Sequence, residues 1–284
     1  MTMKIGIFTD EVHPDFATGL GVMREHGIMY AELRSINGTN LMDLSADELD
    51  DVERLLANNG IQVSALGTPI FKCPLEGRER KIAADTFGAQ EMTYEEHMAL
   101  LPHCFALAER FGTRVVRCFS FWRDDDPEEV FPRVVERFGP ALDLAAKHGF
   151  DLCMENEPTC YAGVGEESHR LIEAVGSPHL KAIWDPGNCL WAEEEPYPKH
   201  YAAIKPHLAH MHVKDARWVN GEIEACRVGK GETDYDGQFR ALAKDGYDGV
   251  YTLEMHYQVA GAPPEAAAIE SAKALREMLT VASA

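Results

Sequence analysis

Long apolar runs are absent from this chain of 284 residues. No stretch approaches the roughly 18 uninterrupted apolar residues of a membrane-spanning helix, so we expect no membrane partner. The first residues, MTMKIGIFTDEV, enter a strand at once and show no basic head, apolar segment or cleavage site. No secretory signal is therefore expected, and the sequence indicates a soluble, cytoplasmic protein.

Basic residues are scarce and cysteine motifs are missing. The chain has 27 Lys and Arg against 47 Asp and Glu, a formal net charge of −20. Because this charge repels a phosphate backbone, we expect no nucleic-acid partner, although a small phosphorylated substrate is not excluded. Seven cysteines form an odd set without a CxxC pair, and several lie inside apolar runs, so we expect buried free thiols and no disulfide.

The positive feature of the sequence is a regular alternation of strand-like and helical runs, with no linker between them. Apolar residues make up 45% of the chain, which allows a sizeable core. Eight strand-helix units close most simply into a (β/α)8 TIM barrel of the α/β class, a single domain over residues 1–284. An open, doubly wound sheet is the alternative, but no glycine-rich nucleotide fingerprint follows the first strand.

The expected strands are short apolar runs, namely Lys4–Thr9, Met29–Arg34, Ile61–Gly67, Arg114–Phe119, Phe150–Glu157, Leu180–Asp185, Leu208–Asp215 and Val250–His256. The expected helices are Asp15–His26, Ser45–Asn59 with a capping box at its start, Tyr94–Phe111, Glu128–His148, Glu167–Val175, Pro198–Lys205, Tyr235–Lys244 and Pro264–Leu279. Two long loops, Thr68–Thr93 and Lys214–Thr233, are interpreted as lids or as insertions without a catalytic role. Three aromatic residues either wall a pocket or pack in the interior: Phe71, Trp122 and Trp218.

Each of the last four expected strands carries a carboxylate or an imidazole near its end. A barrel directs all strand ends to one mouth, where four such side chains can converge: Glu155, Asp185, His212 and Glu254. This mixed set of oxygen and nitrogen ligands suits Mn²⁺, Mg²⁺ or Co²⁺, whereas structural zinc prefers sulfur-rich sites. Any one of these acids alone is more often a helix cap or an ion-pair partner.

Several motifs around these residues resemble the sugar phosphate isomerase/epimerase family, the xylose-isomerase-like barrels. They are ENEP at Glu155, WDPGN at Asp185, HMHVKDAR at His212, GKGETDYDGQFRALAKDGYDG from Gly229 and LEM at Glu254. The resemblance implies a (β/α)8 barrel with one divalent metal ion held by Glu155, Asp185, His212 and Glu254. Mn²⁺ is the first choice, with Mg²⁺, Co²⁺ and Zn²⁺ as alternatives. Because barrels of this family commonly pair, we also expect a homodimer or homotetramer.

The resemblance also has departures. Ketose 3-epimerases of this superfamily carry a histidine where Asn188 stands, whereas their arginine after the histidine ligand has a counterpart in Arg217. Hydroxypyruvate isomerases place a glutamine at the position of His212. The endonuclease branch needs additional histidines and an aspartate for three zinc ions, and those are missing after Asp185 and His212.

The chemistry of such a site follows from its residues. A divalent cation that chelates a hydroxyl and the adjacent carbonyl acidifies the hydrogen between them. Glu155 and Glu254 are the expected catalytic pair, one removing this proton and the other returning it; metal coordination should keep both ionised and burial should raise their basicity. The expected substrate contacts are Glu157, Asn188, His210, Lys214 and Arg217. For His210 a place in the core or behind the ligands is the alternative, and for Lys214 an ion pair with Asp215.

These residues predict a metal-dependent isomerase or epimerase of a ketose or related polyhydroxy carbonyl compound, with a small sugar or polyol as substrate. The alternative is a lyase, because the same enediolate can expel a neighbouring hydroxyl, as the inosose and dehydroshikimate dehydratases on this scaffold do. A non-catalytic sugar-binding barrel is a third possibility, but it gives no reason to keep both glutamates.

Overall fold

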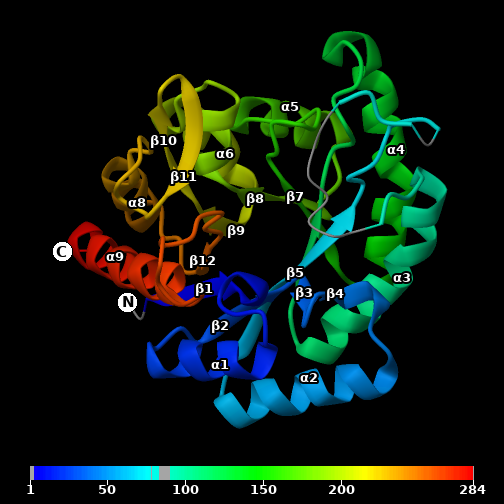
Figure 1. Cartoon of the computed structure of the whole chain (residues 1–284). Helices are drawn as coiled ribbons and strands as arrows, with labels where there is room; N and C mark the ends of the chain where they lie inside the picture. The colour runs from blue at the N-terminus through cyan, green and yellow to red at the C-terminus, as the bar shows by residue number, and fades with distance from the viewer. Residues whose placement is uncertain (1–2, 78, 83–89, 284) are drawn as a thin grey trace.

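Eight parallel strands close into a barrel in the order β1-β12-β9-β8-β7-β6-β5-β2, and helices surround it (Figure 1). The computed structural model describes residues 3–77, 79–82 and 90–283. β1 closes the ring, because Lys4 pairs with Val250 on one side and Gly6 with Tyr30 on the other. The barrel strands are β1 (Lys4–Phe8), β2 (Tyr30–Leu33), β5 (Gln62–Ile70), β6 (Val115–Cys118), β7 (Asp151–Glu155), β8 (Leu180–Trp184), β9 (Leu208–Val213) and β12 (Val250–Leu253). The predicted (β/α)8 barrel is confirmed, and the open sheet is excluded.

The helices are α1 (Phe16–Glu25), α2 (Ala46–Asn59), α3 (Tyr94–Phe111), α4 (Pro127–His148), α5 (Gly165–Val175), α6 (Pro186–Trp191), α7 (Tyr201–Ile204), α8 (Tyr235–Lys244) and α9 (Ala266–Ala282). Short single turns are η1 (Thr9–Glu11), η2 (Leu41–Asp43), η3 (Pro196–His200) and η4 (Lys205–His207). The capping box before α2 is confirmed, since Ser45 accepts from the backbone N–H of Glu48 and the Glu48 carboxylate accepts from that of Ser45. The predicted helix Pro198–Lys205 is confirmed as helical, although η3, α7 and η4 divide it into three consecutive helical types. The preceding helix α6 was not predicted.

The expected loop Lys214–Thr233 is also wrong in part, because it contains the hairpin of β10 (Asp215–Val219) and β11 (Glu222–Cys226). Its turn is Asn220-Gly221, with φ values of 54° and 88°, the left-handed pair of a type I′ turn. A smaller hairpin of β3 (Ser35–Ile36) and β4 (Thr39–Asn40) turns in the same way. The other expected loop, Thr68–Thr93, begins inside β5, and its residues 78 and 83–89 lie outside the described residues.

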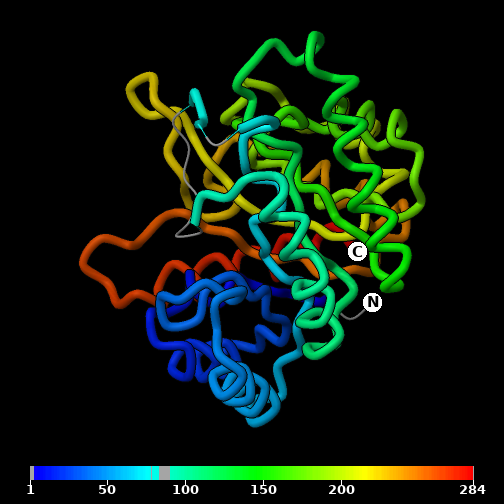
Figure 2. Tube along the Cα trace, turned by 90° about the vertical axis from the view of Figure 1, so that its right-hand side faces the viewer, coloured from blue at the N-terminus to red at the C-terminus, as the bar shows by residue number. Residues whose placement is uncertain are grey.

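The two ends of the barrel differ in what they carry. The hairpin β10–β11 and the segment after β12 project on one side, while both termini lie on the other (Figure 2). The first side is the mouth, where the carboxyl ends of the strands meet and where this fold places its chemistry. No helix in the described part of the chain is long and apolar enough to cross a membrane.

Candidate metal centre

Four acid and imidazole side chains meet at the mouth. Glu155 ends β7, Asp185 directly follows β8, His212 lies in β9 and Glu254 directly follows β12. Each is buried and offers a ligand atom, and these four atoms all lie within 4.8 Å of one another. The structure therefore brings together the four residues that the strand ends predicted.

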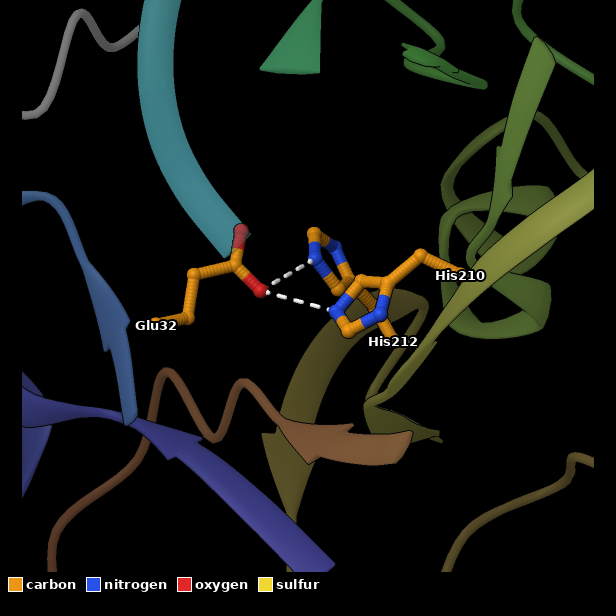
Figure 3. A group of neighbouring side chains, drawn as sticks. All are labelled: Glu32, His210 and His212. Atoms are coloured by element: carbon orange, nitrogen blue, oxygen red, sulfur yellow. Dashed lines mark hydrogen bonds and ion pairs between the residues drawn. The ribbon is translucent and has the colours of Figure 1, made fainter. Parts of the chain in front are cut away.

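His212 lies between two carboxylates. Its Nδ1 is 3.1 Å from Glu155 Oε1, and its Nε2 is 3.1 Å from Glu32 Oε2. His210 Nε2 is also 3.1 Å from Glu32 Oε2 (Figure 3). The same nitrogen lies 3.0 Å from Thr252 Oγ1. Glu32 thus fixes both rings and leaves Nδ1 of His212 facing the other acids. The sequence did not single out Glu32, and His210 contacts it from a buried position.

Three buried cations contact the acids of the cluster. Arg117 Nη1 lies 3.0 Å from Glu155, and Arg34 Nη1 lies 3.2 Å from Glu254. Lys214 Nζ is 2.9 Å from both Asp185 Oδ2 and Glu254 Oε2. The alternative ion pair of Lys214 with its neighbour is therefore wrong.

That neighbour, Asp215, has a different role. Its carboxylate accepts hydrogen bonds of 2.9 Å from the backbone N–H groups of Gly229 and Gly231. It thereby fixes the segment that follows the β10–β11 hairpin, away from any ion pair with Lys214.

The surroundings set the charge of the acids in different ways. Burial raises the pKa of Glu155, but the charges of His212 and Arg117 outweigh burial and lower it overall. Burial likewise raises the pKa of Glu254, and Lys214 with His256 brings it well below the usual range. The expected gain in basicity is therefore wrong, because neighbouring cations dominate over burial. Asp185 is the exception: burial raises its pKa to about 6, with Lys214 opposing and Glu254 adding.

The donor set fits a divalent cation. Asp185 Oδ1 accepts from the backbone N–H of Asn188 and so caps α6. Among the residues that the structure describes, none donates a hydrogen bond to its buried Oδ2, although Lys214 Nζ lies 2.9 Å away. Asp185 is thus both a helix cap and a member of the cluster. Three carboxylates with one imidazole form the hard, oxygen-rich shell that Mn²⁺ and Mg²⁺ accept. Glu155, Asp185, His212 and Glu254 are the residues that would hold such an ion.

A cavity of about 260 Å³ opens beside this cluster. Its lining residues are Lys72, Glu157, Pro158, Thr159, Asn188, Trp191, Lys214 and His256. Three expected substrate contacts, Glu157, Asn188 and Lys214, therefore lie at the cavity. Arg217 is instead an exposed residue of β10, and His210 is buried against Glu32. Its size, and the polar or charged nature of most residues that line it, suit a small metabolite that carries several polar groups.

Of the three predicted aromatic residues, two take the alternative of packing in the interior. Phe71 packs against the Phe121 ring, and Trp122 is buried in a cluster with Phe119. Trp218 on β10 is 45% exposed. Trp191, at the end of α6, lines the cavity, and the Lys214 ammonium lies 5.8 Å from its ring centroid. Neither Trp191 nor α6 was predicted.

Comparison with known proteins identifies the family. A protein of Escherichia coli (strain K12), provisionally named L-ribulose-5-phosphate 3-epimerase SgbU, is 23% identical over an alignment of 240 residues that covers 80% of this chain and 82% of that protein. An inosose dehydratase of Geobacillus thermodenitrificans (strain NG80-2) is 24% identical over an alignment of 168 residues that covers 53% of this chain and 55% of that one.

Solved structures share the fold. A xylose isomerase-like TIM barrel protein from Mycobacterium smegmatis, in complex with magnesium, superimposes with a TM-score of 0.72 at 19% identity, covering 100% of this chain and 98% of that one. The sequence profile of the xylose isomerase-like TIM barrel family matches residues 20–278. With its closed barrel and its cluster of acids at the mouth, the chain belongs to the xylose isomerase-like TIM barrel family.

Proposed function

We propose that this protein is a divalent-metal-dependent isomerase or epimerase of a ketose or a related polyhydroxy carbonyl compound. The observation that carries the proposal is the convergence of Glu155, Asp185, His212 and Glu254 within 4.8 Å beside a small polar cavity. A divalent ion held there, with Mn²⁺ as first choice, would supply the electron withdrawal that acidifies a hydrogen next to a carbonyl.

Glu155 and Glu254 are the proton-transfer pair in this proposal. They lie on β7 and β12, which two other strands separate in the ring, so their carboxylates reach the centre from different sides. Arg117 orients Glu155 and Arg34 orients Glu254, each by a buried ion pair. Because neighbouring cations lower the pKa of both glutamates, each is ionised at neutral pH, which is the protonation state that a general base needs.

Lys214 is the other charged group at the cavity. Burial lowers the pKa of its ammonium, but Asp185 and Glu254 outweigh this and raise it overall, so the group stays protonated. A protonated Lys214 can donate a hydrogen bond to a substrate oxygen on which negative charge develops. Glu157, held 3.0 Å from Lys72 at the cavity wall, is placed to accept from substrate hydroxyls.

A dehydratase is the second candidate, and Asn188 is the observation that favours it. Its amide donates to the backbone oxygen of Asn156 at 2.7 Å and lies 3.4 Å from Glu155 Oε1. Ketose 3-epimerases of the superfamily place a histidine there. A neutral amide engaged in this way cannot supply the charged donor that a histidine offers. The inosose dehydratase among the relatives supports the same alternative.

Product analysis separates the candidates. Purified protein with added Mn²⁺ is incubated with a panel of ketoses, their phosphates and cyclic polyol ketones, and products are identified by NMR. An isomer or epimer of equal mass supports the first function, and a product lighter by one water supports the second. If the wild-type protein binds compounds of the panel but converts none of them, a non-catalytic sugar-binding barrel becomes the better description.

A further inference from the structure

A second group of metal-binding side chains lies at the end of the barrel opposite the mouth. His169 and Glu173 are four residues apart on α5, which places them on one face of that helix. His207 ends η4, directly before β9 begins at Leu208. The three side chains offer ligand atoms that all lie within 4.8 Å of one another.

Both partners approach the same ring nitrogen. His207 Nε2 lies 3.0 Å from His169 Nδ1 and 3.3 Å from Glu173 Oε1. A ring nitrogen has one in-plane position, for either a hydrogen or a lone pair, so it can form a good hydrogen bond with only one of these atoms. A cation placed among the three atoms would instead use a lone pair of each.

The observed separations match such a cation. With Zn–N bonds of about 2.0–2.1 Å, two ligand atoms of a tetrahedral zinc lie about 3.3 Å apart. The two contacts of His207, 3.0 Å and 3.3 Å, lie close to this value, and the ligand atoms of His169 and Glu173 lie within 4.8 Å of each other. His169 and His207 are half-buried and Glu173 is exposed, so an ion can enter from solvent and keep a water molecule as its fourth ligand.

We propose that His169, Glu173 and His207 form a second, zinc-type cation site, independent of the centre at the mouth. Two imidazoles and one carboxylate favour Zn²⁺ over Mg²⁺ and Mn²⁺, which prefer oxygen. Burial and the nearby His169 lower the pKa of His207, so its lone pair is available at neutral pH. The charge of Lys181 also lowers the pKa of His207, and it repels a bound cation. The carboxylate of Glu173 and the net charge of −20 attract a cation.

The position indicates a structural role. A cation there would join α5 to η4, and η4 leads into the strand that carries His210 and His212. The amino-terminal end of a TIM barrel serves stability rather than chemistry. Zinc at this site should therefore raise the unfolding temperature without being required for turnover.

The test counts zinc in the full chain after chelator treatment, zinc loading and gel filtration. Wild type should hold two equivalents, His169→Gln one and Asp185→Ala one. Glu173→Gln serves as a second variant at an exposed position and should bind the ion at least tenfold more weakly. His179→Gln is the matched control, because His179 is a half-buried histidine at the same end of the barrel that contacts Asp151 instead. All seven cysteines are buried in the folded chain and should not compete.

The outcomes separate the two sites. Zinc lost in His169→Gln and kept in Asp185→Ala supports this site even if the mouth binds no zinc. The proposal is overturned if His169→Gln and Glu173→Gln both retain the wild-type zinc content. It is also overturned if zinc fails to raise the unfolding temperature of Asp185→Ala, or raises it equally in Asp185→Ala carrying His169→Gln.

Discussion

Replacing Glu32 by glutamine tests how the centre at the mouth is held. Glu32 is fully buried, and its Oε2 lies 3.1 Å from Nε2 of both His210 and His212. Glutamine keeps the size of the side chain and can place its carbonyl oxygen where Oε2 lies, but it removes the negative charge. Both rings should therefore keep only a weaker, neutral hydrogen bond, and Nδ1 of His212 should be held less firmly toward the other acids.

The magnitude follows from the role of carboxylates behind metal-bound histidines. Removing such a partner typically costs 10- to 100-fold in metal affinity, or about 1.4–2.7 kcal/mol. We expect the affinity of Glu32→Gln for Mn²⁺ to fall within this range. Competition with a chromophoric chelator measures the affinity for Mn²⁺. In addition, ¹⁵N NMR of the ring nitrogens reports the tautomer of His212. A general loosening of the fold would not favour one tautomer over the other.

Thr252→Val is the matched control. It is buried beside the same rings and removes the 3.0 Å contact of Thr252 Oγ1 with His210, but it leaves the contact between Glu32 and His212. Its affinity for Mn²⁺ should stay within about twofold of wild type, well below the change expected for Glu32→Gln. The reasoning fails if Glu32→Gln also stays within that limit, or if both variants weaken the ion equally.

Three other predictions concern catalysis, pH and assembly. Glu254→Gln should keep much of the Mn²⁺ affinity but lose several orders of magnitude in turnover rate, and Glu109→Gln is the exposed control. Turnover of the wild type in D₂O should place deuterium on the carbon beside the carbonyl. A product without solvent deuterium would indicate a hydride shift. Burial lowers the pKa of His97 from 6.5 to about 4, so the unfolded chain binds its proton first as pH falls. This group should therefore lower the free energy of unfolding by about 2 kcal/mol between pH 7.5 and pH 5. Urea unfolding measures this free energy, and His97→Leu should lose about 2 kcal/mol less than the wild type over the same pH range. Light scattering should give a dimer or tetramer, and a monomer mass at micromolar protein would contradict this.

The barrel and its cluster were predictable because their signals are local. Each strand is a short apolar run, and Glu155, Asp185 and Glu254 stand at the points where such runs stop. Parallel strands in a closed ring have one shared end, so position within each run was enough to bring these side chains together.

The contacts that hold the cluster join residues far apart in the sequence, and such contacts have no local sequence signal. Glu32 meets His210 and His212 across separations of 178 and 180 residues, and Arg34 meets Glu254 across 220. A charged residue inside an expected strand gives no indication of its partner on the far side of a barrel.

Other features did have signals that went unused. Asn37-Gly38 and Asn220-Gly221 are the dipeptides of type I′ turns, and both make hairpins. Asp185 followed by Pro186 is a helix start, with a capping side chain and a proline at the first helical position. A helix cap was the alternative to a ligand for each acid of the cluster, whereas Asp185 is both the cap of α6 and a member of the cluster; α6, and with it Trp191, was not predicted.

The position of Lys214 at the mouth would favour either the isomerase or the lyase reaction. Its ammonium lies 2.9 Å from both Asp185 and Glu254, the acids that would also hold a cation. A cation held by these carboxylates would repel the ammonium, and the flexible lysine side chain would then move into the cavity that it already lines. There it would meet a substrate oxygen. If that oxygen belongs to the enediolate, Lys214 stabilises it and the proton returns to carbon; if it belongs to a neighbouring hydroxyl, Lys214 assists its loss as water. The mass of the product therefore reports which substrate oxygen lies next to Lys214.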